Sequence, residues 1–301
     1  ELAGSQTVTR TVTNQGPTAI YEASVDAPDG VHVQVSPSRM RVRRGQSVDY
    51  QVTFTRTTGA LDAYAFGTLT WSDGSHDVTS QLVVRPVQLS APVEVIGSGT
   101  EGSGSIDITF GYDGDYVAGA HGMVAATETP GNVVDDPAND INVALDTGVG
   151  ITIHPVPIPA GSSLARFSLF DADTDGEDDL DLYVFDSTGA FVGGSGSPTS
   201  EEQVDIENPA DTTYLVVVHG WQTDGPDANY TLSSWGVSAD ASADDGSLVI
   251  DSAPTTATLG ATETVSYSWS GLSAGTRYLG RISHGDGNSV AATTNVAIST
   301  K

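Results

Sequence analysis

The sequence has no cysteine, only 11 lysine and arginine residues among 301, and no long apolar run. Without cysteine, the chain can form neither a disulfide framework nor a thiolate metal site. No stretch approaches the roughly 18–20 consecutive apolar residues that cross a bilayer as a helix. These absences exclude a disulfide-stapled scaffold and argue against a membrane partner.

Basic residues are scarcest in the middle of the chain. Residues 1–86 carry 7 basic and 8 acidic groups, residues 87–236 carry 1 and 25, and residues 237–301 carry 3 and 6. Phosphate binding needs lysine and arginine, so this balance argues against nucleic acids and anionic membranes as partners. The net charge of −28 instead favours bound cations or simple solubility.

Helical periodicity is also missing, because no convincing run places apolar residues at i, i+3, i+4 and i+7. Short alternating stretches recur instead, separated by turns rich in glycine, proline and aspartate. That pattern predicts an all-β protein of three consecutive β-sandwich domains, at residues 1–86, 87–236 and 237–301. Ile141–Leu145 is among the strands expected in the second domain, and a linker is expected at Ser238–Gly246.

The most acidic segment, Asp171–Asp181, lies between two apolar runs with strand character. Its carboxylates fall at every second position and are closed by Gly176, which resembles the start of an EF-hand calcium loop. The complete motif is absent, because Leu182 stands at position twelve and the flanks are strands. We predict a calcium site on a β scaffold, with a solvated acidic turn as the alternative. The predicted ligands are Asp171, Asp173, Asp175, Asp178 and Asp179.

A second polar loop follows His219 and Trp221. It can supply a further metal ligand or an aromatic contact to a bound ligand, but we favour a structural hairpin in which Trp221 packs on the end of the sandwich. The residues considered for ligand contact are Tyr183, Tyr214, His219, Trp221, Asp224 and Asp227.

Two other charged groups have competing interpretations. The acidic stretch Asp135–Asp140 can form a second cation site, although Asp-Pro and Asn-Asp are ordinary turn formers. Arg39, Arg41, Arg43 and Arg44 can bind an acidic partner or protect an exposed strand edge. We favour the polar turn in the first case and edge protection in the second.

Several motifs agree, in order, with known accessory domains. Three stretches near the N-terminus resemble the fibronectin type III-like domain that follows the catalytic domain in many subtilisin-like serine proteases. These are Val8–Gly16, Val31–Pro37 and Phe66–Val78. Three further stretches resemble the bacterial pre-peptidase C-terminal domain, which implies a jelly-roll-like sandwich. These are Ala165–Phe170, Asp179–Phe185 and Tyr214–Trp221.

The end of the chain extends this agreement. Ser268–Leu272 and Gly275–Gly280 resemble the small fibronectin-like repeat that ends the same bacterial proteases, which implies a small Ig/fibronectin-like sandwich. Because the chain opens with Glu1 and enters a strand pattern almost at once, we expect a fragment cut at a domain boundary or a mature C-terminal piece.

The resemblance implies the non-catalytic C-terminal region of a secreted, extracellular subtilisin-like serine endopeptidase. Such a region would stabilise the enzyme or position protein substrate, and its partners would be the catalytic domain of the same chain and protein substrate. Asp146-Thr147-Gly148 imitates only one of the three motifs that a subtilisin-type triad needs. The alternative is a free-standing extracellular adhesion or carbohydrate-binding protein, which exposed coplanar aromatic residues would favour.

Overall fold

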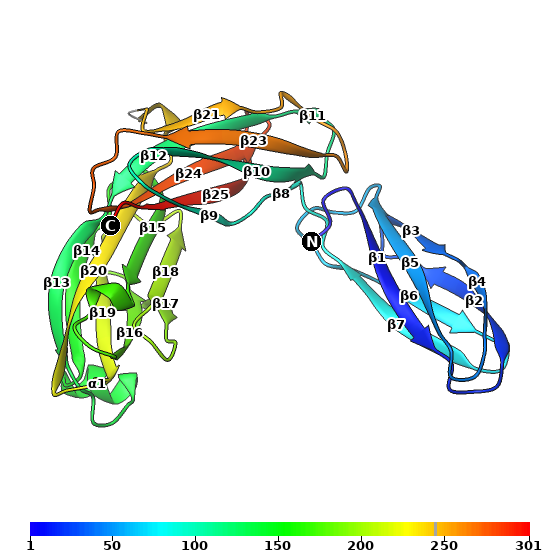
Figure 1. Ribbon diagram of the computed structural model, residues 1–301, viewed down its shortest axis with the longest axis horizontal. Coiled ribbons are helices and arrows are strands. Elements are labelled where there is room, and N and C mark those ends of the chain that lie inside the picture. Colours follow the sequence, from blue (N-terminus) through cyan, green and yellow to red (C-terminus); the bar gives the residue numbers. More distant parts are fainter. Residues whose placement is uncertain (244–245) are drawn as a thin grey trace.

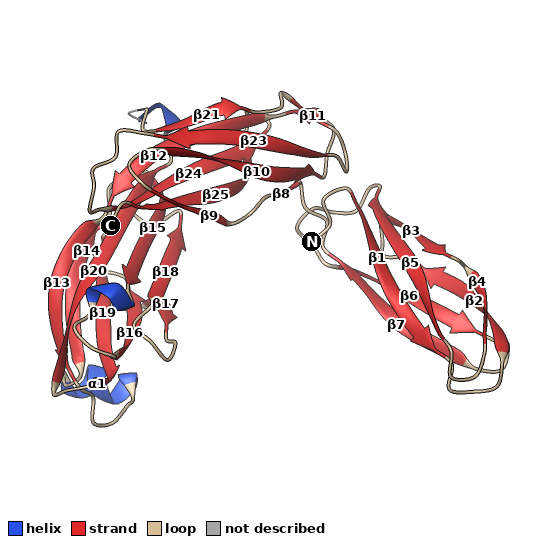
Figure 2. Ribbon diagram, in the orientation of Figure 1, coloured by secondary structure: helices blue, strands red, loops and turns tan. Residues whose placement is uncertain are grey.

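The structure is a computed structural model that describes residues 1–243 and 246–301 (Figure 1). Strands dominate, so the predicted all-β class is confirmed (Figure 2). In the described part of the chain, helical structure is limited to α1 (Ile141–Thr147) and two short 3₁₀ turns, η1 (Asp171–Asp173) and η2 (Ala241–Ala243). No helix there is long and apolar enough to span a bilayer.

The N-terminal sandwich consists of two antiparallel sheets. Their orders are β1-β5-β3 and β4-β2-β6-β7, and the hairpin β6–β7 turns at Asp73-Gly74. Leu69 and Trp71 from one sheet pack against Tyr50 and Val52 from the other. The strands are β1 (Ser5–Thr13), β2 (Ala19–Asp26), β3 (Val31–Ser36), β4 (Arg39–Val42), β5 (Ser47–Arg56), β6 (Ala65–Ser72) and β7 (Asp77–Val84).

A second sandwich is built from two segments that are far apart in the sequence. Its sheets have the orders β21-β23-β10-β8 and β12-β24-β25-β9, and β11 pairs with β22 beside them. The first segment gives β8 (Leu89–Ser90), β9 (Glu94–Ser98), β10 (Gly102–Phe110), β11 (Gly114–Asp115) and β12 (Val117–Ala125). The second segment gives β21 (Leu248–Ser252), β22 (Thr256–Ala257), β23 (Thr262–Trp269), β24 (Arg277–Gly285) and β25 (Val290–Ser299).

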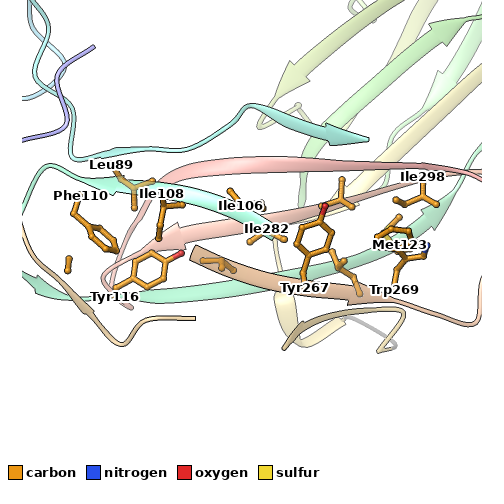
Figure 3. Close-up of a cluster of buried hydrophobic side chains, with 14 of the residues drawn as sticks. Leu89, Ile106, Ile108, Phe110, Tyr116, Met123, Tyr267, Trp269, Ile282 and Ile298 are labelled. Atoms are coloured by element: carbon orange, nitrogen blue, oxygen red, sulfur yellow. The ribbon is translucent and has the colours of Figure 1, made fainter. Parts of the chain in front are cut away.

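This pairing differs from the predicted division at residues 236 and 237. β10 pairs with β23 from Gly102 opposite Trp269 to Thr109 opposite Thr262, and the two segments share one core (Figure 3). Alternation marks where strands lie but not which strands pair. A segment of about 60 residues buries little core alone, so it joins residues 87–125. Asp244 and Asp245 of the predicted linker lie outside the described residues.

The third sandwich is inserted between these two segments. Its sheets have the orders β13-β20-β15-β18 and β14-β19-β16-β17, all antiparallel. The strands are β13 (Thr127–Val134), β14 (Ile151–Pro157), β15 (Ser162–Leu169), β16 (Asp179–Phe185), β17 (Phe191–Ser195), β18 (Glu202–Glu207), β19 (Thr213–Gln222) and β20 (Asp227–Ser238). We call this unit the inserted domain and the two-segment sandwich the host domain.

The strand predicted at Ile141–Leu145 is wrong, because these residues belong to α1. The Asp140 side chain accepts a hydrogen bond from the Asn142 N–H and caps the first turn. Gly148, at φ 74°, ends the helix in the left-handed conformation that glycine adopts without steric cost. These two capping residues outweigh the strand-like pattern between them.

The host and inserted domains share a small apolar core at their junction. Leu164, Trp235 and Val237 of the inserted domain pack with Leu279 of β24, and each is at most 4% exposed. Only Ala126 separates β12 from β13, so the chain crosses between the two domains without a flexible linker at that point. Both features favour a rigid connection.

Candidate functional site

The structure does not bring the five predicted calcium ligands together. Asp173 contacts Arg277 and lies 3.0 Å from the Lys301 ammonium, so it pairs with the host domain. These two cations lower the pKa of Asp173, against the opposing effect of burial. Asp171 is exposed to solvent, and its own backbone N–H donates to Glu201.

Asp175 and Asp178 face the loop between β19 and β20. Asp175 accepts hydrogen bonds from the side chain and backbone of Asn229, at 2.6 and 2.8 Å, and these lower its pKa. One carboxylate oxygen of Asp178 accepts from the Asp224 N–H at 3.0 Å, while the other is buried without a partner. Asp178 is 5% exposed, and burial, followed by repulsion from Asp224 and Asp175, raises its pKa.

Asp179 has other charged neighbours, Asp181 and Glu202, and one of its oxygens is buried without a partner. Burial raises the pKa of Asp179, and repulsion from these two carboxylates adds to the effect. Throughout the described residues, no three or more His, Asp or Glu side chains converge closely enough to hold a metal ion. The five carboxylates therefore do not fit one calcium ion, and two of them, Asp178 and Asp179, each keep one buried oxygen without a partner.

His219 is fully buried and lies between two aspartates. Its Nε2 is 3.0 Å from Asp136, and its Nδ1 is 3.5 Å from Asp181. Burial alone would lower the pKa of His219, but Asp181 and Asp136 together raise it. Burial alone would raise the pKa of Asp136. Hydrogen bonds donated by His219 and by the backbone of residues 138 and 140 outweigh burial and lower this pKa. The two carboxylates therefore favour the protonated form of His219.

This ion pair anchors the loop that carries α1. The backbone of Asp136 donates to Gly220, and Gly220 donates to Gly150, so both ends of the α1 loop are fixed beside β19. The Trp221 ring packs edge-on against His219 at 6.0 Å. These contacts give His219 a structural role, whereas Trp221 stays 36% exposed.

The other residues considered for ligand contact have separate roles. Tyr214 is 4% exposed in the core of the inserted domain, and Tyr183 donates to Asp181 at 3.1 Å. Asp224 accepts from the Glu177 N–H, and Asp227 accepts from Asn132. Tyr183, Tyr214 and Trp221 thus form no exposed coplanar row of the kind that would favour carbohydrate binding.

Sequence reasoning missed the contacts between the host and inserted domains. Residues 87–301 contain 31 acidic residues but only four basic ones. All four basic residues lie at this junction. Arg166 of β15 forms two 2.7 Å bonds to Asp205 and also binds Glu94 of the host domain. The sequence did offer one signal for these contacts, which is the scarcity of basic residues. Where basic residues are so few, each is expected to have a specific acidic partner.

The three cations of the host domain make the reciprocal contacts. Arg281 binds Glu207 and donates to the Ser163 carbonyl at 2.9 Å. Arg277 binds Asp173 and lies 3.7 Å over the Phe170 ring. Lys301 bridges two acids of the inserted domain, with its ammonium 2.9 Å from Glu128 and 3.0 Å from Asp173. The acidic loop is therefore partly an interdomain contact, which its spacing did not reveal.

Comparisons with known proteins locate two families. A fibronectin type-III domain model matches residues 1–84, and a bacterial pre-peptidase C-terminal domain model matches residues 134–220. The second match falls within the inserted domain. Both families are accessory domains rather than catalytic ones.

The curated relatives are subtilisin-like proteases. Subtilisin-like protease SBT5.1 of Arabidopsis thaliana is 44% identical over 87 residues, which cover 27% of this chain and 11% of that protein. The CO(2)-response secreted protease of the same plant is 42% identical over 84 residues, covering 27% and 11%. Pyrolysin of Pyrococcus furiosus is 30% identical over 99 residues, covering 33% and 7%. The chain thus spans about a tenth of the length of the curated relatives it matches.

The similarity to solved structures is weak. The Pseudomonas aeruginosa CupB2 chaperone is 10% identical with a TM-score of 0.24, covering 71% of this chain and 92% of that one.

The family models therefore identify a fibronectin type-III domain at residues 1–84 and a bacterial pre-peptidase C-terminal domain at residues 134–220, in a chain with a segment similar to subtilisin-like proteases.

Proposed function

We propose that this chain is the non-catalytic C-terminal region of a secreted subtilisin-like serine endopeptidase. The observation that carries the proposal is the similarity to subtilisin-like proteases from a plant and an archaeon, at 44% and 30% identity. The sequence supports it, since two of the three motifs of a subtilisin-type triad are missing. Its partner in the same chain would be the catalytic domain.

The paired domains support a stabilising role. A shared apolar core and four buried or partly buried cations join the host and inserted domains into one block. A rigid block attached to a catalytic domain lowers the freedom of its chain end, and it can also hold a protein substrate near the catalytic residues. If the block positions substrate, its removal should slow the cleavage of an intact protein more than the cleavage of a short peptide.

The experiment compares the full-length protease with a version that lacks residues 1–301. A stabilising role predicts a shorter half-life at elevated temperature, with kcat/KM for a short chromogenic peptide unchanged. A positioning role predicts slower cleavage of an intact protein but not of that peptide. The proposal fails if neither quantity changes, or if the gene encodes no peptidase upstream of Glu1.

We further propose that calcium stabilises the inserted domain at Asp178 and Asp224. The support is the buried, unpartnered oxygen of Asp178 and its raised pKa, which both indicate a carboxylate short of positive charge. Two carboxylates leave the rest of a calcium coordination sphere to water and carbonyl oxygens.

The Asp178→Asn variant separates a cation site from a merely strained carboxylate. In chelator the variant should melt higher than wild type, since it removes a buried charge whose ionisation is unfavourable in the folded state. Calcium should raise the melting temperature of wild type and leave that of the variant unchanged. Equal responses of the two proteins to calcium would contradict the site.

A further inference from the structure

One sheet of the N-terminal sandwich has an outer face that is apolar at one end. Phe66 of β6 lies opposite Val83 of β7, and on this face the two side chains are 66% and 51% exposed. Tyr64 immediately precedes β6 and is 67% exposed, with its ring 6.5 Å from that of Phe66. We call Tyr64, Phe66 and Val83 the Phe66 patch.

Farther along β6 and β7 the same face becomes polar. The next outward pair is Thr68 opposite Gln81, and the pair after it is Thr70 opposite Thr79, whose hydroxyls are 2.9 Å apart. A sheet face that meets water along its whole length is expected to be polar throughout. Apolar side chains gathered at one end, beside polar ones, instead indicate a contact surface.

The first residues of the chain are fixed at the apolar end of this face. Arg85 directly follows β7 and binds both Glu1 and Asp62, at 3.0 Å each. Asp62 belongs to the loop that carries Tyr64. The Leu2 N–H donates to the Arg85 carbonyl at 2.8 Å, and the Leu2 side chain is buried in the core. Glu1 therefore lies beside the Phe66 patch, at the end of the sandwich nearest the host domain (Figure 1).

The size of the Phe66 patch favours a partner that belongs to the same chain. Aromatic side chains bury about 150–250 Å² each, so these three residues offer at most about 600 Å². A stable complex with a free partner buries roughly 800 Å² on each side. A domain tethered beside the patch needs less contact, because the tether gives it an effective concentration in the millimolar range. The host and inserted domains belong to the same chain but leave the patch exposed.

We propose that the catalytic domain packs on the Phe66 patch through an apolar surface of its own. This inference rests on the proposed function, under which the catalytic domain precedes Glu1. The matched segment makes up 11% of one curated relative and 7% of another, so those proteins have ample chain outside it for such a neighbour. Packing would cover both aromatic rings and fix the N-terminal sandwich relative to the catalytic domain.

The first test is photo-crosslinking in the full-length protease. Phe66→p-benzoylphenylalanine places a photoreactive ring in the patch, and mass spectrometry identifies the residues that it crosslinks. Phe191 of β17 is the matched control position, because it is also an exposed phenylalanine, at 62%, that contacts one other ring. Position 66 should crosslink to the catalytic domain, and position 191 should not.

The second test compares one substitution in two proteins. Phe66→Thr removes the ring but keeps a residue that favours strands. In the 301-residue chain Phe66 is exposed, so Tm should change by less than about 1 °C. In the full-length protease the ring would be covered, so the transition of the N-terminal sandwich should fall by about 2–4 °C. Phe191→Thr should shift Tm equally in the two proteins.

Several results would overturn the docking proposal while leaving the proposed function intact. These are no crosslink from position 66, crosslinks only to the host or inserted domain or to a second copy of the chain, equal yields at positions 66 and 191, and equal Tm shifts for Phe66→Thr in the two proteins.

Failure of the proposed function gives different results. A gene that encodes no peptidase upstream of Glu1 would defeat that function and remove the occupant with it. A crosslinked peptidase domain whose half-life and protein cleavage do not change when residues 1–301 are removed would uphold the docking and defeat the proposed role.

Discussion

Replacing Arg166 by methionine tests whether scarce cations hold the host and inserted domains together. The guanidinium forms two parallel 2.7 Å bonds to Asp205 within the inserted domain and reaches Glu94 of the host domain. Only 5% of the Arg166 side chain is exposed. Methionine keeps the apolar stem in place, so the substitution mainly removes the charge and its hydrogen bonds.

The cost can be estimated from the exposure of the partners. Removing one member of a fully buried ion pair destabilises a protein by roughly 3–5 kcal/mol, because the other charge is left unpaired. Asp205 and Glu94 stay 28% and 26% exposed, so water can partly solvate them after the substitution. We therefore expect a smaller loss for Arg166→Met, of about 2–3 kcal/mol. For a unit of this size it corresponds to about 5–10 °C in Tm.

Differential scanning calorimetry of the full chain measures the shift. All four cations of residues 87–301 belong to the junction, so the matched control is Arg39→Met in the N-terminal sandwich. Arg39 and its partner Glu22 are each 66% exposed, and we expect less than about 1 kcal/mol there. A shift below 2 °C for Arg166→Met, or losses of free energy that are equal in the two variants, would refute the reasoning.

Three further predictions concern the same domains. Raising the pH through the raised pKa of His219 should destabilise the inserted domain, because the stability of the buried imidazolium is complete below the ordinary pKa and lost as the proton leaves. His219→Gln should flatten that part of a Tm-against-pH curve, and parallel curves would contradict the ion pair. Arg281→Glu should lower Tm, and adding Glu207→Arg should recover part of the loss, which a contact without charge attraction would not allow. Sodium chloride should raise Tm at low ionic strength, since it screens repulsion among exposed acids more than the buried pairs, and a falling Tm would show that the pairs dominate.

The strands of the N-terminal sandwich could be predicted because local chemistry determines them. Val31, Val33 and Val35 alternate with polar residues in β3, and Asp73-Gly74 forms the turn between β6 and β7. Turn formers and a period of two are both short-range signals. The edge position of β4 was predicted from its arginines, and the structure places β4 at the edge of its sheet with Arg39 and Arg41 exposed.

The insertion could not be predicted by those rules. β10 and β23 pair across more than a hundred residues, and nothing in either strand alone specifies its partner. Alternation fixes which face of a strand is buried, and many strands satisfy that condition equally well. The family model that ends at residue 220 also stops short of β20, so it does not reveal where the inserted domain closes.

The acidic loop shows why spacing alone is a weak guide to a metal site. An EF-hand turns alternate carboxylates toward one ion, but here each one meets a different neighbour. Arg277 and Lys301, over a hundred residues away, bind Asp173, and Asn229 binds Asp175. Asp178 ends the loop and Asp179 begins β16, and their side chains have different neighbours: Asp178 accepts from the Asp224 N–H, whereas Asp181 and Glu202 repel Asp179. The carboxylates of the loop are therefore divided among several neighbours, which their spacing in the sequence does not reveal.

The distribution of charge makes the junction the main electrostatic restraint on the second half of the chain. With 31 acids and four bases, these residues repel one another wherever they are exposed, and that repulsion favours separating the host domain from the inserted domain. Dispersed bases would relieve the repulsion only weakly, because exposed pairs contribute little. All four basic side chains instead lie where water is partly excluded, which strengthens each ion pair. Each pair then holds the host and inserted domains together at a defined point. Asp173 links this restraint to the acidic loop, so a cation bound at Asp178 would stabilise the junction as well as the loop.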